Sequence, residues 1–264
     1  MATMLEALEA IMRELGDLLL EWRTQGMIHG NWEGSQLKAD ADWCAHDFLV
    51  EHLRRSWPSI PVISEEDAGS HNACRPDEYW LIDPIDGTAS FCNGFDGFVT
   101  QVALMRGCQP ILAVVHAPAL GLTYTASQDA PASCNHVPIS TTVFGTRAPI
   151  LIDNYPEPRG IARRLYDEIG CGGYVESGSI GQKICRVADG TADLFVKDVT
   201  VRDWDLAPAE LILAGAGGVL TTLAGNPVPY EGNFERAGLI AATDHTLAQL
   251  VLDWNRTRTE AKSN

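Results

Sequence analysis

The sequence predicts a mixed fold in two parts, an α+β half over residues 1–145 and an α/β half over residues 146–264. In the first half, three β-rich runs are separated by glycines, which predicts hairpins in an antiparallel sheet. In the second half, short apolar runs alternate with helix-length segments, a pattern typical of α/β proteins. The chain is long enough for one large domain or two compact halves. Residues 131–140 form the predicted loop between the halves.

The first half is predicted to open with two helices. Thr3 and Glu6 fit a capping box at the start of the first helix, which carries an apolar face at helical spacing. That face consists of Leu5, Leu8, Met12, Leu15 and Leu19. A second helix is expected over residues 41–56. It is ended by Pro58 and followed by a short strand at residues 62–63.

Four further strands are predicted in the first half. The run Tyr79–Ile82 is short, apolar and aromatic, which favours a buried strand that stops at Asp83. The other three strands are expected at residues 98–105, 111–116 and 122–126. Acidic residues where a buried strand stops are well placed for a site at its carboxyl end.

The second half is predicted to alternate between strands and helices. Strands are expected at residues 150–152 and 194–196. The expected helices cover residues 157–169, 180–189, 205–216 and 243–254. Gly190 and Gly217 follow the second and third of these helices, as glycine commonly does after a helix end.

The composition is that of an acidic globular protein. Hydrophobic residues make up 45% and charged residues 20% of the chain, and the net charge is −16. This charge argues against binding to nucleic-acid polymers, which requires lysine and arginine to neutralise phosphates. It does not exclude a small anionic substrate, because bound cations can invert the charge of a local site.

The cysteine pattern and hydropathy predict a soluble cytoplasmic protein. The seven cysteines are odd in number and form no CxxC pair, which favours reduced thiols. The N-terminus lacks the features of a signal peptide. No apolar stretch is long enough to cross a bilayer, so no membrane partner is expected.

Three acidic clusters lie next to predicted strands or helices, at Ser64–Asp67, Asp83–Thr88 and Trp204–Asp205. Each alone also fits a solvated turn, and Asp205 fits the N-cap of a helix. Together they offer several carboxylate oxygens, and Mg²⁺ is bound in proteins by carboxylates, carbonyls and water. The three clusters therefore predict a magnesium site.

The central cluster combines metal ligands with groups that suit a phosphate. Pro84 presets a turn that can aim the two flanking aspartates and the carbonyl of Ile85 at one point. Gly87 allows close approach of the backbone. If Thr88 opens a helix, the free N–H groups there form an anion site, and the threonine hydroxyl can orient a water.

These motifs resemble those of the inositol monophosphatase superfamily, and the likeness extends over nearly the whole chain. It rests on Ser64–Asp67, Trp80–Thr88, Trp204–Ala207 and Gly217–Gly218, in the family's order and spacing. The resemblance implies a layered αβαβα sandwich of the inositol monophosphatase and fructose-1,6-bisphosphatase type. It also implies a Mg²⁺-dependent phosphatase that is lithium-sensitive and homodimeric.

The same resemblance implies the metal ligands. Glu65, Asp83 and the carbonyl of Ile85 would bind a first Mg²⁺ ion, and Asp83, Asp86 and Asp205 would bind a second. Asp83 would bridge the two ions. A third, weaker ion would lie near Glu65 and Asp42. At Asp42 the family's Thr-x-x-Asp pattern has Ala39 in place of threonine. The expected cofactor is therefore two to three Mg²⁺ ions.

Catalytic roles also follow from the resemblance. Thr88 and Glu65, helped by Asp42, would orient a water that the metal activates and that attacks phosphorus in line. The N–H groups of Gly87 and Thr88 would hold the phosphate oxygens. No covalent phosphoenzyme is implied.

The identity of the phosphate ester depends on a few residues. Lys183 ends the run Gly178–Lys183, which resembles the 3'(2'),5'-bisphosphate nucleotidase branch and could meet a second phosphate. As a single charge, it also fits a solvated helix residue. The branch often has Lys-Glu after the central motif, where this chain has Ala89–Ser90.

Two other residues bear on the substrate. Asp198 lies seven residues before Asp205, the distance at which inositol monophosphatases carry an acidic residue that contacts a ring hydroxyl. Arg202 is a further possible phosphate contact. Both also fit exposed surface positions.

The sequence predicts an enzyme that hydrolyses a small anionic phosphate ester, namely a 3'(2'),5'-bisphosphate nucleotidase that converts 3'-phosphoadenosine 5'-phosphate to AMP. An inositol-1-phosphate or other sugar phosphatase is the alternative. A binding protein that keeps the fold without turnover is a more remote alternative, and the presence of Glu65, Asp83, Asp86, Thr88 and Asp205 speaks against it.

Overall fold

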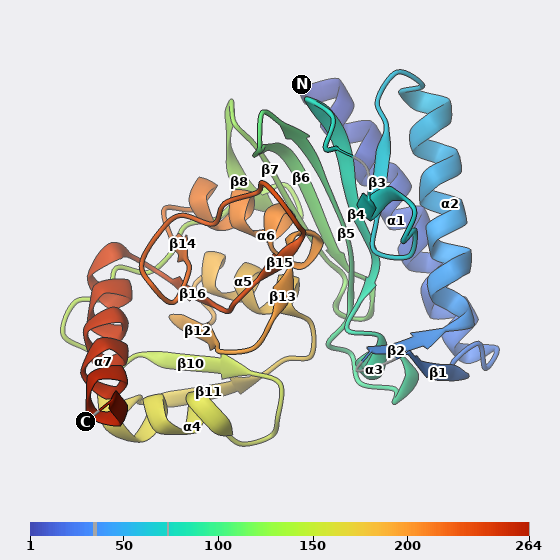
Figure 1. Ribbon diagram of the computed structural model, residues 1–264. Coiled ribbons are helices and arrows are strands. Elements are labelled where there is room, and N and C mark those ends of the chain that lie inside the picture. The colour runs from blue at the N-terminus through green and yellow to red at the C-terminus, as the bar shows by residue number, and fades with distance from the viewer. Residues whose placement is uncertain (34–35, 73, 264) are drawn as a thin grey trace.

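The computed structural model describes residues 1–33, 36–72 and 74–263 and arranges them in five layers (Figure 1). Two helices cover a seven-stranded sheet, two lie between it and a five-stranded sheet, and two cover the far face of the second sheet. In that order they are α1 (Ala2–Thr24), α2 (Asp40–Ser56), α5 (Ile180–Ala188), α6 (Asp203–Gly215), α4 (Gly160–Leu165) and α7 (His245–Ser263). The expected αβαβα sandwich is confirmed.

The seven-stranded sheet contains its strands in chain order. They are β3 (Val62–Ser64), β4 (Glu78–Asp86), β5 (Val99–Arg106), β6 (Gln109–Ala117), β7 (Leu122–Ser127), β8 (Ala130–Cys134) and β9 (Val137–Pro138). The β3–β4 pair is parallel and the others are antiparallel. The predicted hairpins are therefore confirmed.

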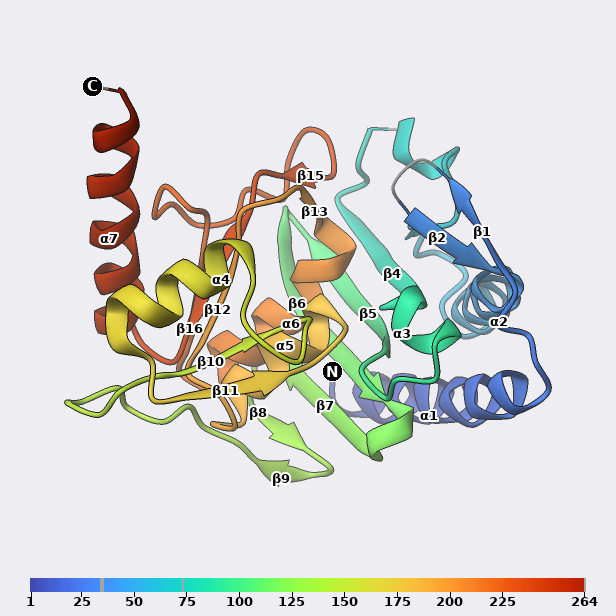
Figure 2. The same ribbon diagram turned by 90° about the horizontal axis from the view of Figure 1, so that it is seen from below.

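The five-stranded sheet has the order β11-β10-β12-β16-β14. Its strands are β10 (Ile150–Asp153), β11 (Gly173–Glu176), β12 (Leu194–Lys197), β14 (Val219–Thr221) and β16 (Leu239–Ala242). Figure 2 shows α7 and α2 at opposite ends of the molecule, with both sheets between them.

Short elements connect the layers. They are β1 (Gly30–Glu33), β2 (Gln36–Ala39), α3 (Thr88–Cys92), β13 (Val201–Arg202), β15 (Glu235–Arg236), the 3₁₀ turns Ser70–Asn72 and Pro118–Leu120, and the π turn Tyr166–Gly170. Within the described residues, no helix is both long enough and apolar enough to cross a membrane.

Burial on both faces explains why the strands are nearly continuous apolar runs. In β4, Trp80 and Ile82 pack against α1 and α2, whereas Tyr79 and Leu81 belong to the core shared with α5 and α6. Successive residues of a strand point to opposite faces, so a sheet between two helical layers needs apolar residues at both. The middle helices thereby bury residues of both sheets in one core.

The predicted capping box at the N-terminus is wrong. Helix α1 already begins at Ala2, with Met1 as its N-cap and no side-chain cap. The N–H groups of Met4 and Leu5 both donate to the carbonyl of Met1, at 3.0 Å. Thr3 therefore lies inside the first turn, and its hydroxyl is not needed to cap the helix.

Two strand predictions also need correction. The expected loop at residues 131–140 contains most of β8 and all of β9, which extend the first sheet. Strand β4 does not stop at Asp83 but continues to Asp86, with a shift of register against β5 between these two residues. Pro84 has no N–H to donate to the ladder, so the shift takes the form of a bulge.

Candidate active site

Most predicted site residues meet in a pocket of about 420 Å³. Those that line it are Glu65, Asp83, Ile85, Asp86, Gly87, Thr88, Arg202 and Asp205. Asn154, Gly178 and Thr200 add to its wall. Segments before and after residue 145 therefore both contribute to the pocket.

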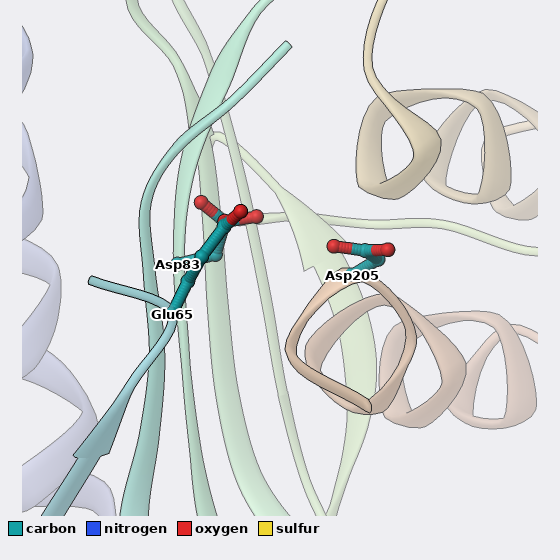
Figure 3. A group of neighbouring side chains, drawn as sticks. All are labelled: Glu65, Asp83 and Asp205. Carbon is teal, nitrogen blue, oxygen red and sulfur yellow. The ribbon is translucent and has the colours of Figure 1, made fainter. Parts of the chain in front are cut away.

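Three carboxylates face one another in this pocket (Figure 3). Strands β3 and β4 run parallel with Ser64 beside Ile82, so Glu65 and Asp83 occupy neighbouring positions. Asp205, the third residue of α6, points towards them from the second half. One oxygen of each side chain lies within 4.8 Å of the others, which brings all three within reach of one divalent cation.

Asp83 shows what this carboxylate cluster, Glu65, Asp83 and Asp205, is built to bind. Its side chain is 1% exposed. In the described part of the chain no N–H group or hydroxyl donates to its carboxylate, and its side-chain partner is another carboxyl group, that of Glu65. A buried carboxylate paired only with another carboxyl group is unfavourable once both are charged, and a cation is the partner that would relieve this cost. Oxygen ligands of this kind fit Mg²⁺.

Burial and mutual repulsion raise the pKa values of the cluster. The pKa of Glu65 rises to about 8, because its carboxyl is buried and lies near the charge of Glu66. Burial, followed by the charge of Glu65, raises the pKa of Asp83 well above its ordinary value. Burial and the charge of Asp86 do the same for the pKa of Asp205. The metal-free cluster therefore retains protons that a bound cation would displace.

Asp205 also caps its own helix. Its Oδ2 accepts a hydrogen bond from the N–H of Arg202 at 2.8 Å. The N-cap interpretation is therefore wrong: the N-cap is Arg202, and Asp205 is the third residue of α6, from which its carboxylate bonds back to the N-cap. One carboxylate oxygen is fixed by the backbone, which leaves the other to face the pocket.

Asp86 lies in the pocket, and its Oδ2 is held by two groups of the second half and one of the first. Its Oδ2 accepts hydrogen bonds from Ser179 Oγ at 2.6 Å, from the N–H of Gly181 at 2.7 Å and from Gln101 Nε2 at 3.3 Å. Burial raises the pKa of Asp86, and the bond from Ser179 opposes that rise. Asp86 therefore connects the start of α5 to the pocket.

The end of the central motif forms the predicted helix start. Gly87 precedes α3 in the left-handed conformation, with φ of 91°, and a Cβ there would lie 3.1 Å from the carbonyl of Gly97. Both features call for glycine. Thr88 Oγ1 lies 3.1 Å from Asp42 Oδ1 and 3.1 Å from the carbonyl oxygen of Ile85. The expected threonine–aspartate pair is thus brought together.

Lys183 is not among the residues that line the pocket. The side chain is fully buried, so it is not the solvated helix residue of the alternative interpretation. Its Nζ donates to Asn154 Oδ1 and, at 3.0 Å, to the carbonyl of Gly178. Burial, followed by the charge of Lys197, lowers the pKa of Lys183 to about 7. The lysine therefore supports two parts of the pocket wall.

The structure separates the other two predicted substrate contacts. Arg202 lines the pocket and forms an ion pair with Glu235. Asp198 is not part of the wall; its carboxylate is exposed and pairs with Arg164 at 3.5 Å.

Sequence reasoning overlooked residues that support or line the site. Ser179 is the N-cap of α5, and its Oγ accepts from the N–H of Gln182 at 2.9 Å while it donates to Asp86. A serine directly before a helix is a recognisable signal. Asn154 follows a buried strand, which is another position favoured by sites. Gln101 sits within a buried strand and gave no such signal.

The fold and the acidic pocket define the class of a metal-dependent phosphoric monoester hydrolase. The chain belongs to the inositol monophosphatase family, whose sequence profile matches residues 1–256. This confirms the predicted family and the prediction of an enzyme, and Mg²⁺ dependence is typical of the family.

Individual relatives agree with this assignment. The 3'(2'),5'-bisphosphate nucleotidase CysQ of Haemophilus influenzae is 32% identical over 223 residues, which cover 81% of each protein. The CysQ of Buchnera aphidicola is 28% identical over 233 residues, 86% of this chain and 88% of the relative. An IMPase of Thermotoga maritima superimposes with a TM-score of 0.85 at 22% identity, over 98% of this chain and 99% of that one. The last comparison shows the shared fold.

The metal-free protein is expected to lose stability as the pH rises from about 5 to about 9. The pKa of Glu65 is ordinarily 4.5 and rises to about 8 in the folded state. Between these values the folded state holds a proton that the unfolded state has released, so raising the pH favours unfolding. Mg²⁺ should reverse this trend above pH 8, because the deprotonated oxygens bind it. Thermal unfolding with Mg²⁺ or a chelator measures both effects.

The variant Glu65→Gln is the control for this prediction, since it cannot release the proton. It should show a flatter dependence of metal-free stability on pH than the wild type. Wild-type protein that is equally stable at both ends of the pH range without metal would contradict the prediction.

Proposed function

We propose that the protein is a 3'(2'),5'-bisphosphate nucleotidase that hydrolyses 3'-phosphoadenosine 5'-phosphate to AMP and orthophosphate. The chemistry is supported above all by the carboxylate cluster, in which no N–H group or hydroxyl of the described residues donates to the buried oxygens of Asp83. The choice of nucleotide is supported by the two CysQ relatives, which match 81% and 86% of this chain.

Two to three Mg²⁺ ions are proposed for the pocket. The ligands would be Glu65, Asp83, the carbonyl of Ile85, Asp86 and Asp205. Asp83 would bridge two ions, and a third would lie near Asp42. When bound, Mg²⁺ lowers the pKa of a water and neutralises charge on the phosphate.

Thr88 and Asp42 are proposed to orient the attacking water. Thr88 Oγ1 can donate its proton to Asp42 Oδ1, 3.1 Å away, and accept a hydrogen bond from the water. Asp42 Oδ2 in turn accepts from the N–H of Ala39 at 2.7 Å, which fixes the carboxylate. Glu65 would accept the proton that the water releases as it attacks phosphorus.

The phosphate and the nucleotide are proposed to contact different parts of the wall. The N–H groups of Gly87 and Thr88 would bind the oxygens of the transferred phosphate. Arg202 would face the second phosphate. Lys183 would act on the substrate by holding Asn154 and Gly178. Asp198 is left out of these contacts because it lies outside the wall.

Further properties are proposed from the family resemblance. They are inhibition by Li⁺, a homodimer and a cytoplasmic location. The free thiols of the seven cysteines support the last. A boundary between the halves at residue 145 is also proposed, between the end of β9 at Pro138 and the start of β10 at Ile150.

The proposed substrate is tested by comparing phosphate esters side by side. With Mg²⁺, kcat/KM for 3'-phosphoadenosine 5'-phosphate should exceed that for inositol 1-phosphate, fructose 1,6-bisphosphate and histidinol phosphate by about tenfold or more, since a site built for one substrate's polar groups rejects analogues without them. Phosphate release is the measurement, with and without Li⁺. A higher value for inositol 1-phosphate would establish the alternative, and no release of phosphate from any ester would refute both.

Asp83→Asn should abolish turnover while leaving the fold intact. Removing a side chain that only hydrogen-bonds to a metal ligand lowers metal affinity or activity by about 10–100-fold. Loss of a bridging ligand itself should therefore lower kcat by at least about 100-fold. Metal-free thermal stability should not fall, because a repelling buried charge is removed. Steady-state kinetics and thermal unfolding measure the two effects. Wild-type turnover in this variant would rule out the bridging assignment.

Lys183→Ala should weaken hydrolysis of the bisphosphate more than hydrolysis of a monophosphate. Removing its hydrogen bonds releases Asn154 and Gly178, and a loss of about tenfold in kcat/KM corresponds to one hydrogen bond to a charged group. The ratio of kcat/KM for 3'-phosphoadenosine 5'-phosphate to that for 3'-AMP is the measurement. Arg186→Ala, on the same helix but bonded to Asp189, is the control. An equal effect on both substrates would contradict this role.

A further inference from the structure

Beside the carboxylate cluster, a group of aromatic and charged side chains joins the two halves. We call it the clasp. It consists of His71 and Arg75 from the connection between β3 and β4, and of Asp203, Trp204, Phe234 and Arg236 from the second half. None of these residues lines the pocket. The clasp residues nevertheless contact the segments that carry Glu65 and Asp205, either directly or through another residue of the clasp.

His71 connects the segment of Glu65 to the segment of Asp205. Its Nε2 lies 2.7 Å from the carbonyl oxygen of Ser64, the residue before Glu65. Its ring stacks on Trp204, the residue before Asp205, with a centroid distance of 4.7 Å and an interplanar angle of 26°. One side chain therefore contacts the chain directly next to two ligands that come from different halves.

Arg75 makes the same connection through charge. Its Nη2 donates to Asp203 Oδ2 at 2.6 Å and to the carbonyl of Asn233 at 2.8 Å, and its Nη1 donates to the carbonyl of Tyr230 at 3.1 Å. The guanidinium lies over the ring of Phe234, 3.9 Å from its centroid. These contacts all run from the first half to the second.

Asp203 fixes the start of the helix that carries Asp205. It is the first residue of α6 and is fully buried. Besides Arg75, its Oδ2 accepts from Arg236 Nη2 at 2.9 Å, and its N–H donates to the carbonyl of Phe234 at 3.0 Å. The carboxylate of Asp203 is held by two guanidinium groups, and its backbone is held by the bond to Phe234. Asp203 therefore cannot shift without breaking these charge-assisted contacts.

We propose that the clasp sets the Mg²⁺ affinity of the carboxylate cluster by fixing the positions of Glu65 and Asp205 relative to each other. The proposal rests on the metal site of the proposed function. Mg²⁺ requires near-ideal octahedral geometry, and the chain between Glu65 and Asp205 is far too long to impose a spacing by itself. His71, Arg75 and Asp203 are thus positioning residues that touch neither substrate nor ion.

The test is direct Mg²⁺ binding by isothermal titration calorimetry on the chelator-treated full chain, without substrate. Arg75→Ala should raise the Kd of the tightest Mg²⁺ about tenfold, the lower end of the effect of losing partners that support metal ligands. His71→Phe keeps the stack and loses the contact to Ser64, and His71→Gln keeps a donor and loses the stack. Each should weaken Mg²⁺ binding, and these milder variants test the proposal if Arg75→Ala does not fold.

Arg147→Ala is the matched control. Arg147 pairs with Asp193, which is also buried, and that pair lies wholly within the second half. This variant should lower the temperature of unfolding without changing the Mg²⁺ affinity. Unchanged affinity in the Arg75 and His71 variants would overturn the proposal, as would an equal loss in Arg147→Ala.

The same titration separates the clasp from the proposed function. A wild-type protein that binds no Mg²⁺ would overturn both the clasp and the metal site. A wild type that binds Mg²⁺ but does not hydrolyse the nucleotide would refute the proposed substrate. The proposal for the clasp would then be decided by the Mg²⁺ affinities of the Arg75 and His71 variants alone.

Discussion

Like charges held together in a buried pocket are the constraint on which the rest of the structure depends. Glu65, Asp83 and Asp205 would repel one another without a cation, and burial adds to the cost of charging each of them. The protein brings them together with rigid elements, because β3 and β4 pair in parallel and α6 is packed in the core between the sheets. The large core fixes the elements that carry these carboxylates, so the three side chains stay together in the absence of a cation.

The metal site and the substrate wall are connected through Asp86. The bulge at Pro84 lets β4 continue to Asp86, whose carboxylate then receives the Ser179 hydroxyl and the N–H of Gly181 at the start of α5. The residues just before α5 form part of the wall, as Gly178 does. A change in the charge on Asp86 would therefore alter its hydrogen bonds to Ser179 and Gly181, next to the wall residue Gly178.

Local patterns sufficed to predict the long helices, the central strands of the first sheet and the acidic motifs, but they missed β11, β14 and β16 of the second sheet. The strand of Trp80 is visible as a short apolar and aromatic run and the helix of Leu8 from periodicity, and Asp83 and Asp86 lie in one short motif whose chemistry is readable from residue type. The burial of Lys183 and the clasp of Arg75 and Asp203 could not be predicted in this way. Both depend on contacts between segments far apart in the chain, and a lysine or arginine gives the same local signal whether its partner is water or a distant carbonyl.

The burial of Lys183 bears on how the proposed nucleotidase site would recognise a second phosphate. A lysine with its pKa lowered to about 7 by burial and by Lys197 carries only part of its charge at neutral pH, and its three acceptors are the side chain of Asn154 and the carbonyls of Ser177 and Gly178. It is therefore suited to fixing the shape of the wall. In the proposed function, direct attraction for a second phosphate would come from groups that face the pocket, such as Arg202. Discrimination between a nucleotide and an inositol would follow from where Asn154 and Gly178 are held, since the proposed metal site would act on the phosphate and not on the alcohol.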